Sequence, residues 1–133
     1  MAEFNFAEVT PLPMVAVAAI AINTFVKTET TTVKGVTTST SAADFLTCGV
    51  AVDAQPTIGG MLGVQSYGLA KVKAGAAIAA GAMVTSDATG RAVTAATGNS
   101  VFGVNIGGAV AAANEVATIL LTPLPNLTGP TTP

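Results

Sequence analysis

The side chains that most often perform chemistry in proteins are scarce in this chain. The sequence has no histidine and one cysteine, Cys48, so neither a Ser-His-Asp triad nor a Cys-His pair can be assembled. No two acidic residues lie within four positions of each other, so no local carboxylate pair is present for acid–base catalysis. We therefore expect no enzymatic activity, and an enzyme whose dispersed carboxylates converge on folding is the remote alternative. The acidic residues are Glu3, Glu8, Glu29, Asp44, Asp53, Asp87 and Glu115.

The remaining motifs predict structure rather than a binding site for a metal or cofactor. Cys48 lies in the apolar run FLTCGVAV and is expected to be a buried structural thiol. The glycines of IGGMLG lack the Lys-Ser/Thr of a phosphate loop, and GVQSYG lacks the glycine spacing of a nucleophile elbow. Asp44 and Asp87 are expected to stabilise turns. We predict no metal site and no cofactor.

The composition predicts a folded protein with an unusually uncharged surface. Of the 133 residues, 50% are hydrophobic and only 9% are charged, against about a quarter in ordinary domains. The net charge of −2 gives no electrostatic reason to bind nucleic acid. Two interpretations stay open at this point: an ordinary domain of low charge, or a subunit whose surface lies against other protein.

The apolar run MVAVAAIAI, residues 14–22, is too short to cross a bilayer. The residues before it carry Glu3 and Glu8 and no basic side chain, the wrong charge for a signal peptide. We expect a buried strand here and no membrane association, with a signal peptide as the minor alternative.

Short β-rich segments separated by glycine or proline predict an all-β fold, a small β-barrel or β-sandwich built from short hairpins. The Thr-rich stretch 28–41 is expected to be a solvated hairpin or a loose loop. We predict one β-rich domain over 14–122, preceded by an extended N-terminal arm, 1–13, and followed by a Pro-rich C-terminal tail, 123–133. Pro11 and Pro13 are expected to prevent regular structure in the arm, and the prolines of the tail to prevent it from extending a sheet.

The stretch AGAAIAAGAMVTSDATGRAV, residues 74–93, predicts a bent lead-in and a hairpin. Gly75 and Gly81 interrupt any helix, which leaves Ile78 as an apolar plug. AMVTS and RAVTA are expected to pair across the turn DATG, where Asp87 hydrogen-bonds its own turn and Gly90 adopts a positive φ. SVFGVNIG is expected to be a strand kinked at a glycine, AVAAANE a crossover loop or short helix, and EVATILLTP the closing strand.

This hairpin region resembles the small phage capsid cement proteins, also called head decoration proteins. The resemblance covers about residues 45–122. It rests on Ala74-Gly75, Ile78, Ala80-Gly81, Val84, Asp87, Gly90-Arg91 and Val93, with Gly63-Val64, Gly68–Val72, Phe102–Val104 and Glu115–Leu121 around them. It implies a small β-rich structural protein of the virion, without cofactor, that binds the outer surface of an expanded icosahedral head and bridges subunits of the major capsid protein. It also implies a homo-oligomer, a trimer or a dimer.

Residues 1–44 fit that family less well, so the arm is expected to be this chain's own device for attachment or oligomerisation. A short edge strand packed on its own domain is the alternative for the arm. Tyr67 is expected either to anchor an interface or to occupy a half-buried sheet position. A carbohydrate-binding β-barrel of a tail fibre or surface adhesin is the rival function. The candidate contacts with the capsid or a neighbouring subunit are Phe4, Phe6, Val9, Leu12, Tyr67, Leu124 and Leu127.

Overall fold

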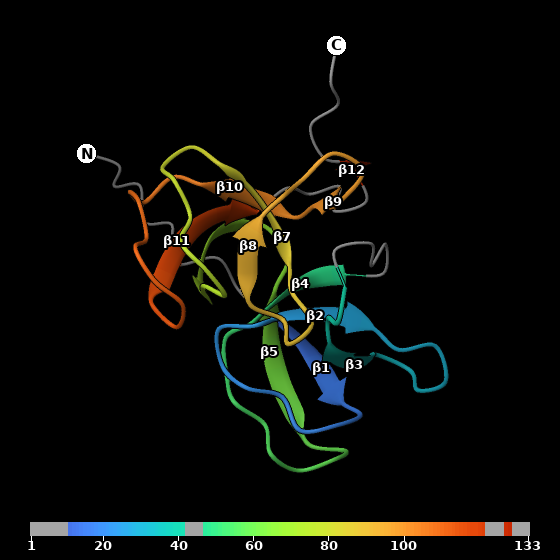
Figure 1. The fold of residues 1–133 in the computed structure, drawn as a ribbon. Helices are drawn as coiled ribbons and strands as arrows, with labels where there is room; N and C mark the ends of the chain where they lie inside the picture. The colour runs from blue at the N-terminus through green and yellow to red at the C-terminus, as the bar shows by residue number, and fades with distance from the viewer. Residues whose placement is uncertain (1–10, 42–46, 122–126, 129–133) are drawn as a thin grey trace, which may run out of the picture.

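The computed structural model describes residues 11–41, 47–121 and 127–128, and the expected all-β fold is confirmed (Figure 1). Within these ranges the chain forms strands and loops and no helix. The strands are β1 (Leu12–Ala16), β2 (Phe25–Thr28), β3 (Gly35–Thr38), β4 (Thr47–Ala51), β5 (Met61–Gln65), β6 (Gly68–Lys73), β7 (Met83–Ser86), β8 (Ala92–Thr94), β9 (Ser100–Val101), β10 (Gly103–Asn105), β11 (Val116–Leu121) and β12 (Leu127–Thr128).

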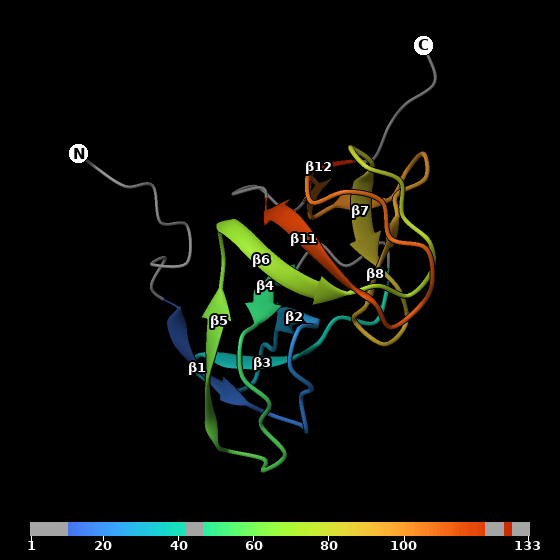
Figure 2. The same cartoon turned by 90° about the vertical axis from the view of Figure 1, so that its left-hand side faces the viewer.

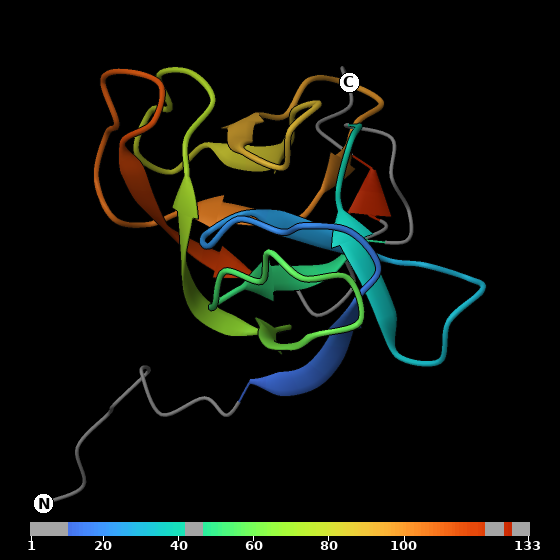
Figure 3. The same ribbon diagram turned by 90° about the horizontal axis from the view of Figure 1, so that it is seen from below.

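The first five strands form a closed barrel in the order β1-β3-β2-β4-β5. β1 runs parallel to β3, with Val15 opposite Gly35, and all other neighbours are antiparallel. The β2–β3 connection, 29–34, projects from the barrel, as Figure 3 shows in cyan, so the Thr-rich stretch contains the expected hairpin. The barrel is filled by small and branched side chains: Ala16, Ile20, Val26, Val36, Ala51, Leu62 and Val64.

Five later strands form a second sheet in the order β6-β11-β10-β7-β8. The chain passes from the first barrel to this sheet through the short connection between β5 and β6 (Figure 2). Its two edges come together just beyond β6, because Ala74 forms a parallel bridge with Ala92 of β8. The N–H of Gly75 donates to the carbonyl of Ala92 at 2.7 Å. The second sheet therefore curls into a barrel of the same strand order as the first.

The two barrels are an internal repeat. The segments AVAAIA, 16–21, and AGAAIA, 74–79, differ at one position and occupy the same place in each barrel. Ile20 and Ile78 are both buried and both form an isolated antiparallel bridge to the loop before the last strand of their barrel. The loops themselves are held by matching backbone hydrogen bonds. The matched donors and acceptors are Ala16–Gly60 and Ala74–Glu115, Ile20–Gln55 and Ile78–Val110, and Asn23–Ala51 and Gly81–Asn105.

The barrels meet along a shared apolar seam. Phe25 of β2 and Phe102, between β9 and β10, are fully buried, with ring centroids 5.1 Å apart in an edge-to-face arrangement. Both rings belong to one core cluster with Val50 of the first barrel and the interior of the second. A backbone hydrogen bond of 2.7 Å, from Phe25 N–H to the carbonyl of Gly90, also crosses the seam. The rings and this bond hold the two barrels against each other.

Residues 74–93 fold as the sequence predicts, whereas residues 14–22 do not. Ile78 is the buried plug, and β7 and β8 form the expected hairpin. The predicted single strand over 14–22 is wrong: β1 ends at Ala16, and the chain turns before β2 with Asn23 at a φ of 63°. This loop is the counterpart of the 74–81 lead-in. The expected strand 100–107 is interrupted at Phe102, and AVAAANE is a loop.

The prolines do not prevent strand formation at either end of the described chain. Pro13 lies inside β1, opposite Gly63 of β5. The carbonyl of Gly63 accepts a hydrogen bond from Val52, and its N–H donates to Asp53, so Gly63 uses both backbone groups away from β1. Pro13 therefore loses no ladder bond to β5. In the tail, Leu127–Thr128 forms β12 and pairs with β9, so the expectation that the tail adds no strand is wrong.

Candidate functional site

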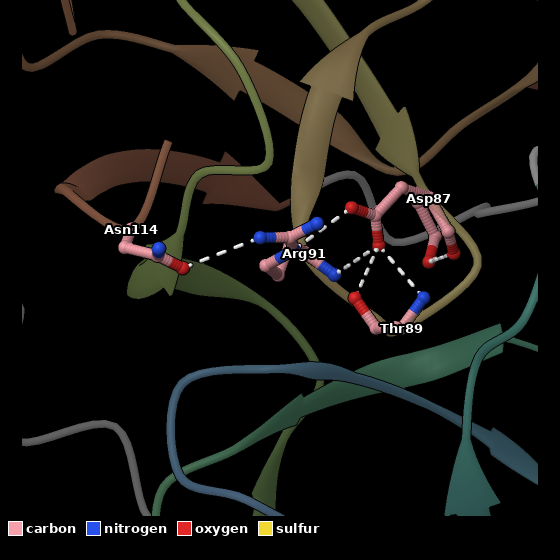
Figure 4. Close-up of polar contacts among 5 residues, drawn as sticks. Asp87, Thr89, Arg91 and Asn114 are labelled. Carbon is pink, nitrogen blue, oxygen red and sulfur yellow. Dashed lines mark hydrogen bonds and ion pairs between the residues drawn. The ribbon is translucent and has the colours of Figure 1, made fainter. Parts of the chain in front are cut away.

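The turn between β7 and β8 is ordered by the Asp87 carboxylate (Figure 4). Oδ1 of Asp87 accepts hydrogen bonds from the N–H groups of Thr89 and Arg91, at 2.8 and 2.9 Å, and from the Thr89 hydroxyl. Oδ2 accepts from Nε of Arg91 at 2.9 Å, and Nη1 of Arg91 donates to Asn114 at 3.2 Å. Gly90 has a φ of 81°, so both predicted turn residues perform the roles that the sequence indicates.

The electrostatics of this turn predict a pH-dependent contribution to stability. Burial raises the pKa of Asp87, but hydrogen bonds from Thr89 and Arg91 and the Arg91 charge outweigh it, so the pKa lies below its ordinary value. A lowered pKa in the folded state stabilises the fold above the unfolded-state pKa, and this contribution is lost as pH falls through the folded-state pKa. We expect Asp87→Asn to lower Tm at about pH 7 and to differ less from the wild type below about pH 3. Calorimetry across this range tests it, and a Tm difference independent of pH would contradict it.

A row of apolar side chains crosses the outer face of the second barrel. Val104 of β10 lies opposite Met83 on one side and Leu120 on the other, and Leu120 lies opposite Leu69 of β6. Met83 and Leu120 are exposed, and the other two are half-buried. We call Leu69, Met83, Val104 and Leu120 the apolar row. The outward positions of a sheet are usually polar, so this row is suited to contact with another protein.

A second apolar surface lies where the barrel closes between β1 and β5. Met61 is 60% exposed and lies opposite Val15. A groove of about 290 Å³ runs beside it, lined by Pro11, Pro13, Asp53, Met61, Leu62 and Gly63. Among the described residues that line the groove, Asp53 is the only charged one, and its carboxylate accepts the N–H of Gly63. Adjacent Leu12 is 48% exposed.

Only some of the contacts predicted from sequence can be placed. Leu12 is on β1 rather than in a separate arm, and Leu127 is on β12, opposite Val101. Tyr67 is 55% exposed in the connection between β5 and β6, not in a half-buried sheet position, and leads into the strand that carries Leu69. Phe4, Phe6, Val9 and Leu124 lie outside the described residues. The Cys48 side chain also lies outside the described part of the structure.

Sequence reasoning missed Met61 and the apolar row. The sequence signal for the apolar row was present in β11, because VATILL is apolar at nearly every position. Ala117, Ile119 and Leu121 face inward, and Leu120 faces outward. A strand exposed on one face ordinarily alternates apolar with polar residues. A continuously apolar strand at the surface therefore indicates a contact face.

Among the described residues, no three His, Cys, Asp or Glu side chains are grouped closely enough to hold a metal ion. No helix in that part of the chain is long and apolar enough to span a membrane.

Comparison with known proteins finds similarity in fold and not in sequence family. No protein-family model matches the sequence, and no curated protein matches it significantly. Among solved structures, the chain is similar to the N base of the head fibre protein gp8.5 of bacteriophage phi29, with a TM-score of 0.69 and 18% sequence identity. The alignment covers 86% of this chain and 94% of that one. At this identity the likeness shows a shared fold, which spans both barrels rather than one of them.

Proposed function

We propose that this chain is a structural protein of a phage virion. In this proposal it binds the outer surface of an icosahedral head and stabilises the expanded capsid by bridging subunits of the major capsid protein. The observation that carries the proposal is the fold shared with the base of a phage head fibre over most of both chains. The resemblance of residues 45–122 to cement proteins is the second support for the proposal, and it rests on those residues alone, because no family model matches the sequence.

The surface of the protein is consistent with such a role. The apolar row lies on paired strands of one sheet whose inner face packs in the core shared by the two barrels, so its side chains form one continuous contact face. A head displays many copies of each site, and an oligomer that contacts several at once gains affinity through effective concentration. We propose a homotrimer, or a dimer, in which the arm residues Phe4, Phe6 and Val9 and the tail residue Leu124 add contacts. The proposal includes no catalysis, no cofactor, and no binding to nucleic acid or membrane.

A β-barrel module of a tail fibre or surface adhesin is the second candidate. The neighbour's description as the base of a fibre favours a fibre module, although that fibre is on the head and not on the tail. A base of this kind would attach to a virion and hold a further fibre segment. Binding to purified heads that lack other decoration separates a head-bound protein from a module of a tail fibre or adhesin, and a gain in the heat stability of those heads separates capsid stabilisation from attachment as a fibre base.

We expect Leu120→Lys to weaken head binding by about tenfold or more, because a charge in the middle of the apolar row must be desolvated on contact. The matched control is Val33→Lys, which adds the same charge at a position that is 87% exposed on the β2–β3 loop. Co-sedimentation of each purified variant with expanded, undecorated heads measures the affinity. Equal binding by both variants would exclude the apolar row as the contact, and no binding by the wild-type protein would contradict the proposed function itself.

A further inference from the structure

The first barrel has an open cleft at the C-terminal end of β1, beside the loop before β5. Its volume is about 420 Å³. The β2–β3 loop forms one wall with Glu29, and the loop before β5 forms the other with Ile58, which is 73% exposed. The lining residues are Val15, Ala16, Val17, Glu29, Thr31, Thr32, Ile58 and Gly59.

The internal repeat identifies the corresponding place in the second barrel. Glu29 N–H donates to the carbonyl of Gly35 at 2.8 Å, as Asp87 N–H does to that of Arg91 at 2.9 Å. These bonds make Glu29 the counterpart of Asp87, and Gly35 that of Arg91.

A second pair of hydrogen bonds shows which residues correspond on the opposite walls of the two sites. Gly59 N–H donates to the carbonyl of Ala16, and Asn114 N–H donates to that of Ala74, both at 2.7 Å. Gly59 and Asn114 share a positive φ, 87° and 71°. Asn114 is therefore the counterpart of Gly59.

In the second barrel an arginine side chain bridges these two walls. The Arg91 guanidinium extends from the turn, pairs with Asp87 through Nε and reaches Asn114 through Nη1 (Figure 4). In the first barrel the position of Arg91 is Gly35, where a Cβ would lie 2.8 Å from Cβ of Thr32 and 3.1 Å from Cγ1 of Val17. The position of Asn114 is Gly59, where a Cβ would meet nothing within 4 Å. The first barrel thus keeps the carboxylate and lacks the cation that pairs with it in the second.

Glu29 is arranged to accept such a cation. Its Oε1 accepts the Thr31 N–H at 2.9 Å, as Oδ1 of Asp87 accepts that of Thr89. The Thr31 hydroxyl lies 2.7 Å from both carboxylate oxygens, and the Thr30 N–H and the Thr32 hydroxyl also donate to the carboxylate. All of these donors are neutral, so the negative charge of the carboxylate is not paired by them. The hydrogen bond from the Thr31 side chain is the main cause that holds the pKa of Glu29 below its ordinary value. The group is therefore ionised at neutral pH.

We propose that this cleft is a docking site for an arginine side chain of a partner protein. The guanidinium would pair with Oε2 of Glu29, in the way Arg91 pairs with Asp87, and its aliphatic stem would lie against Val17 and Ile58. The planar fork of arginine suits a carboxylate better than the ammonium of lysine does, so the site should prefer arginine.

The direct test is an NMR titration of the full chain with N-acetyl-arginine amide. We expect saturable shifts of the amides of Thr31, Thr32, Ile58 and Gly59, with an affinity at least about fivefold weaker for N-acetyl-lysine amide. Glu29→Gln, whose amide oxygen can still accept the Thr31 N–H, should weaken arginine binding about tenfold or more. Asp53→Asn changes a carboxylate in the groove beside Met61 and should leave arginine binding unchanged. Absence of these shifts, or equal binding by Glu29→Gln, would overturn the proposal.

A second variant tests the equivalence on which the site is based. Arg91→Ala opens the corresponding space in the second barrel, so the same compound should also shift the amides of Thr89 and Asn114. Absence of these shifts would mean that the Arg91–Asp87 ion pair does not predict how arginine binds in the cleft. Both titrations use the isolated protein, so their outcome is independent of whether the protein binds heads.

Discussion

Phe102→Ala is expected to lower the free energy of unfolding by about 3–5 kcal/mol, the usual cost of removing a buried aromatic ring. Phe102 is 2% exposed and contacts Phe25 edge-to-face across the seam. The substitution removes both the transfer energy of the ring and this pair interaction, which contributes a further 0.5–1.5 kcal/mol or so. Because small domains are stable by about 5–15 kcal/mol, the loss would be a large part of the total.

Urea denaturation of the two proteins measures this effect, and Tyr67→Ala is the matched control. It also removes an aromatic ring, but from a side chain that is 55% exposed, so the expected loss is about 1 kcal/mol or less. Equal losses in both variants would mean that the seam contributes no more stability than the surface, against the packing described here.

Gly90→Ala is the second substitution with a large expected effect, a loss of about 3 kcal/mol or more. The φ of 81° costs an alanine about 1–2 kcal/mol. In addition, a Cβ at this position would lie 2.9 Å from the carbonyl oxygen of Phe25 and 2.7 Å from Cγ2 of Thr38. One of these contacts is with backbone, so the turn must move away from the first barrel and weaken the seam.

The control for Gly90 separates strain from crowding. Gly98 has a similar φ of 89°, but a Cβ there would meet nothing within 4 Å. Gly98→Ala should therefore cost only the conformational part, about 1–2 kcal/mol. Thermal unfolding of both variants gives the comparison. If the two alanine variants have the same Tm, close packing of the turn on the first barrel is not a source of stability.

The local features of the fold could be predicted because they depend on neighbouring residues. Asp87 and Gly90 specify their turn through positions a few residues apart, and Ile78 is a plug because the glycines around it disfavour a helix. The same type of reasoning failed at Pro13. Whether a proline fits a strand depends on which way its partner's backbone groups point, and this partner, Gly63, is distant in the sequence.

The repeat was detectable in principle, because AVAAIA and AGAAIA are nearly identical. It is obscured elsewhere because equivalent positions share backbone geometry but need not share side-chain type. Glu29 and Asp87 are both carboxylates, whereas Gly35 occupies the position of Arg91. The seam could not be predicted either, because it joins Phe25 to Phe102 through the packing of two complete barrels. The apolar row depends on the register of four strands, which sequence alone does not fix.

The measurement that tests the proposed function most directly is cryo-electron microscopy of virions of a phage whose genome encodes this chain. Density for this two-barrel fold is predicted on the outer surface of the head, at threefold or twofold positions, with the apolar row against major capsid protein subunits. Such a map would also show whether residues 1–10 contact the capsid. A head without this density, or the two-barrel fold found on a tail fibre instead, would contradict the account.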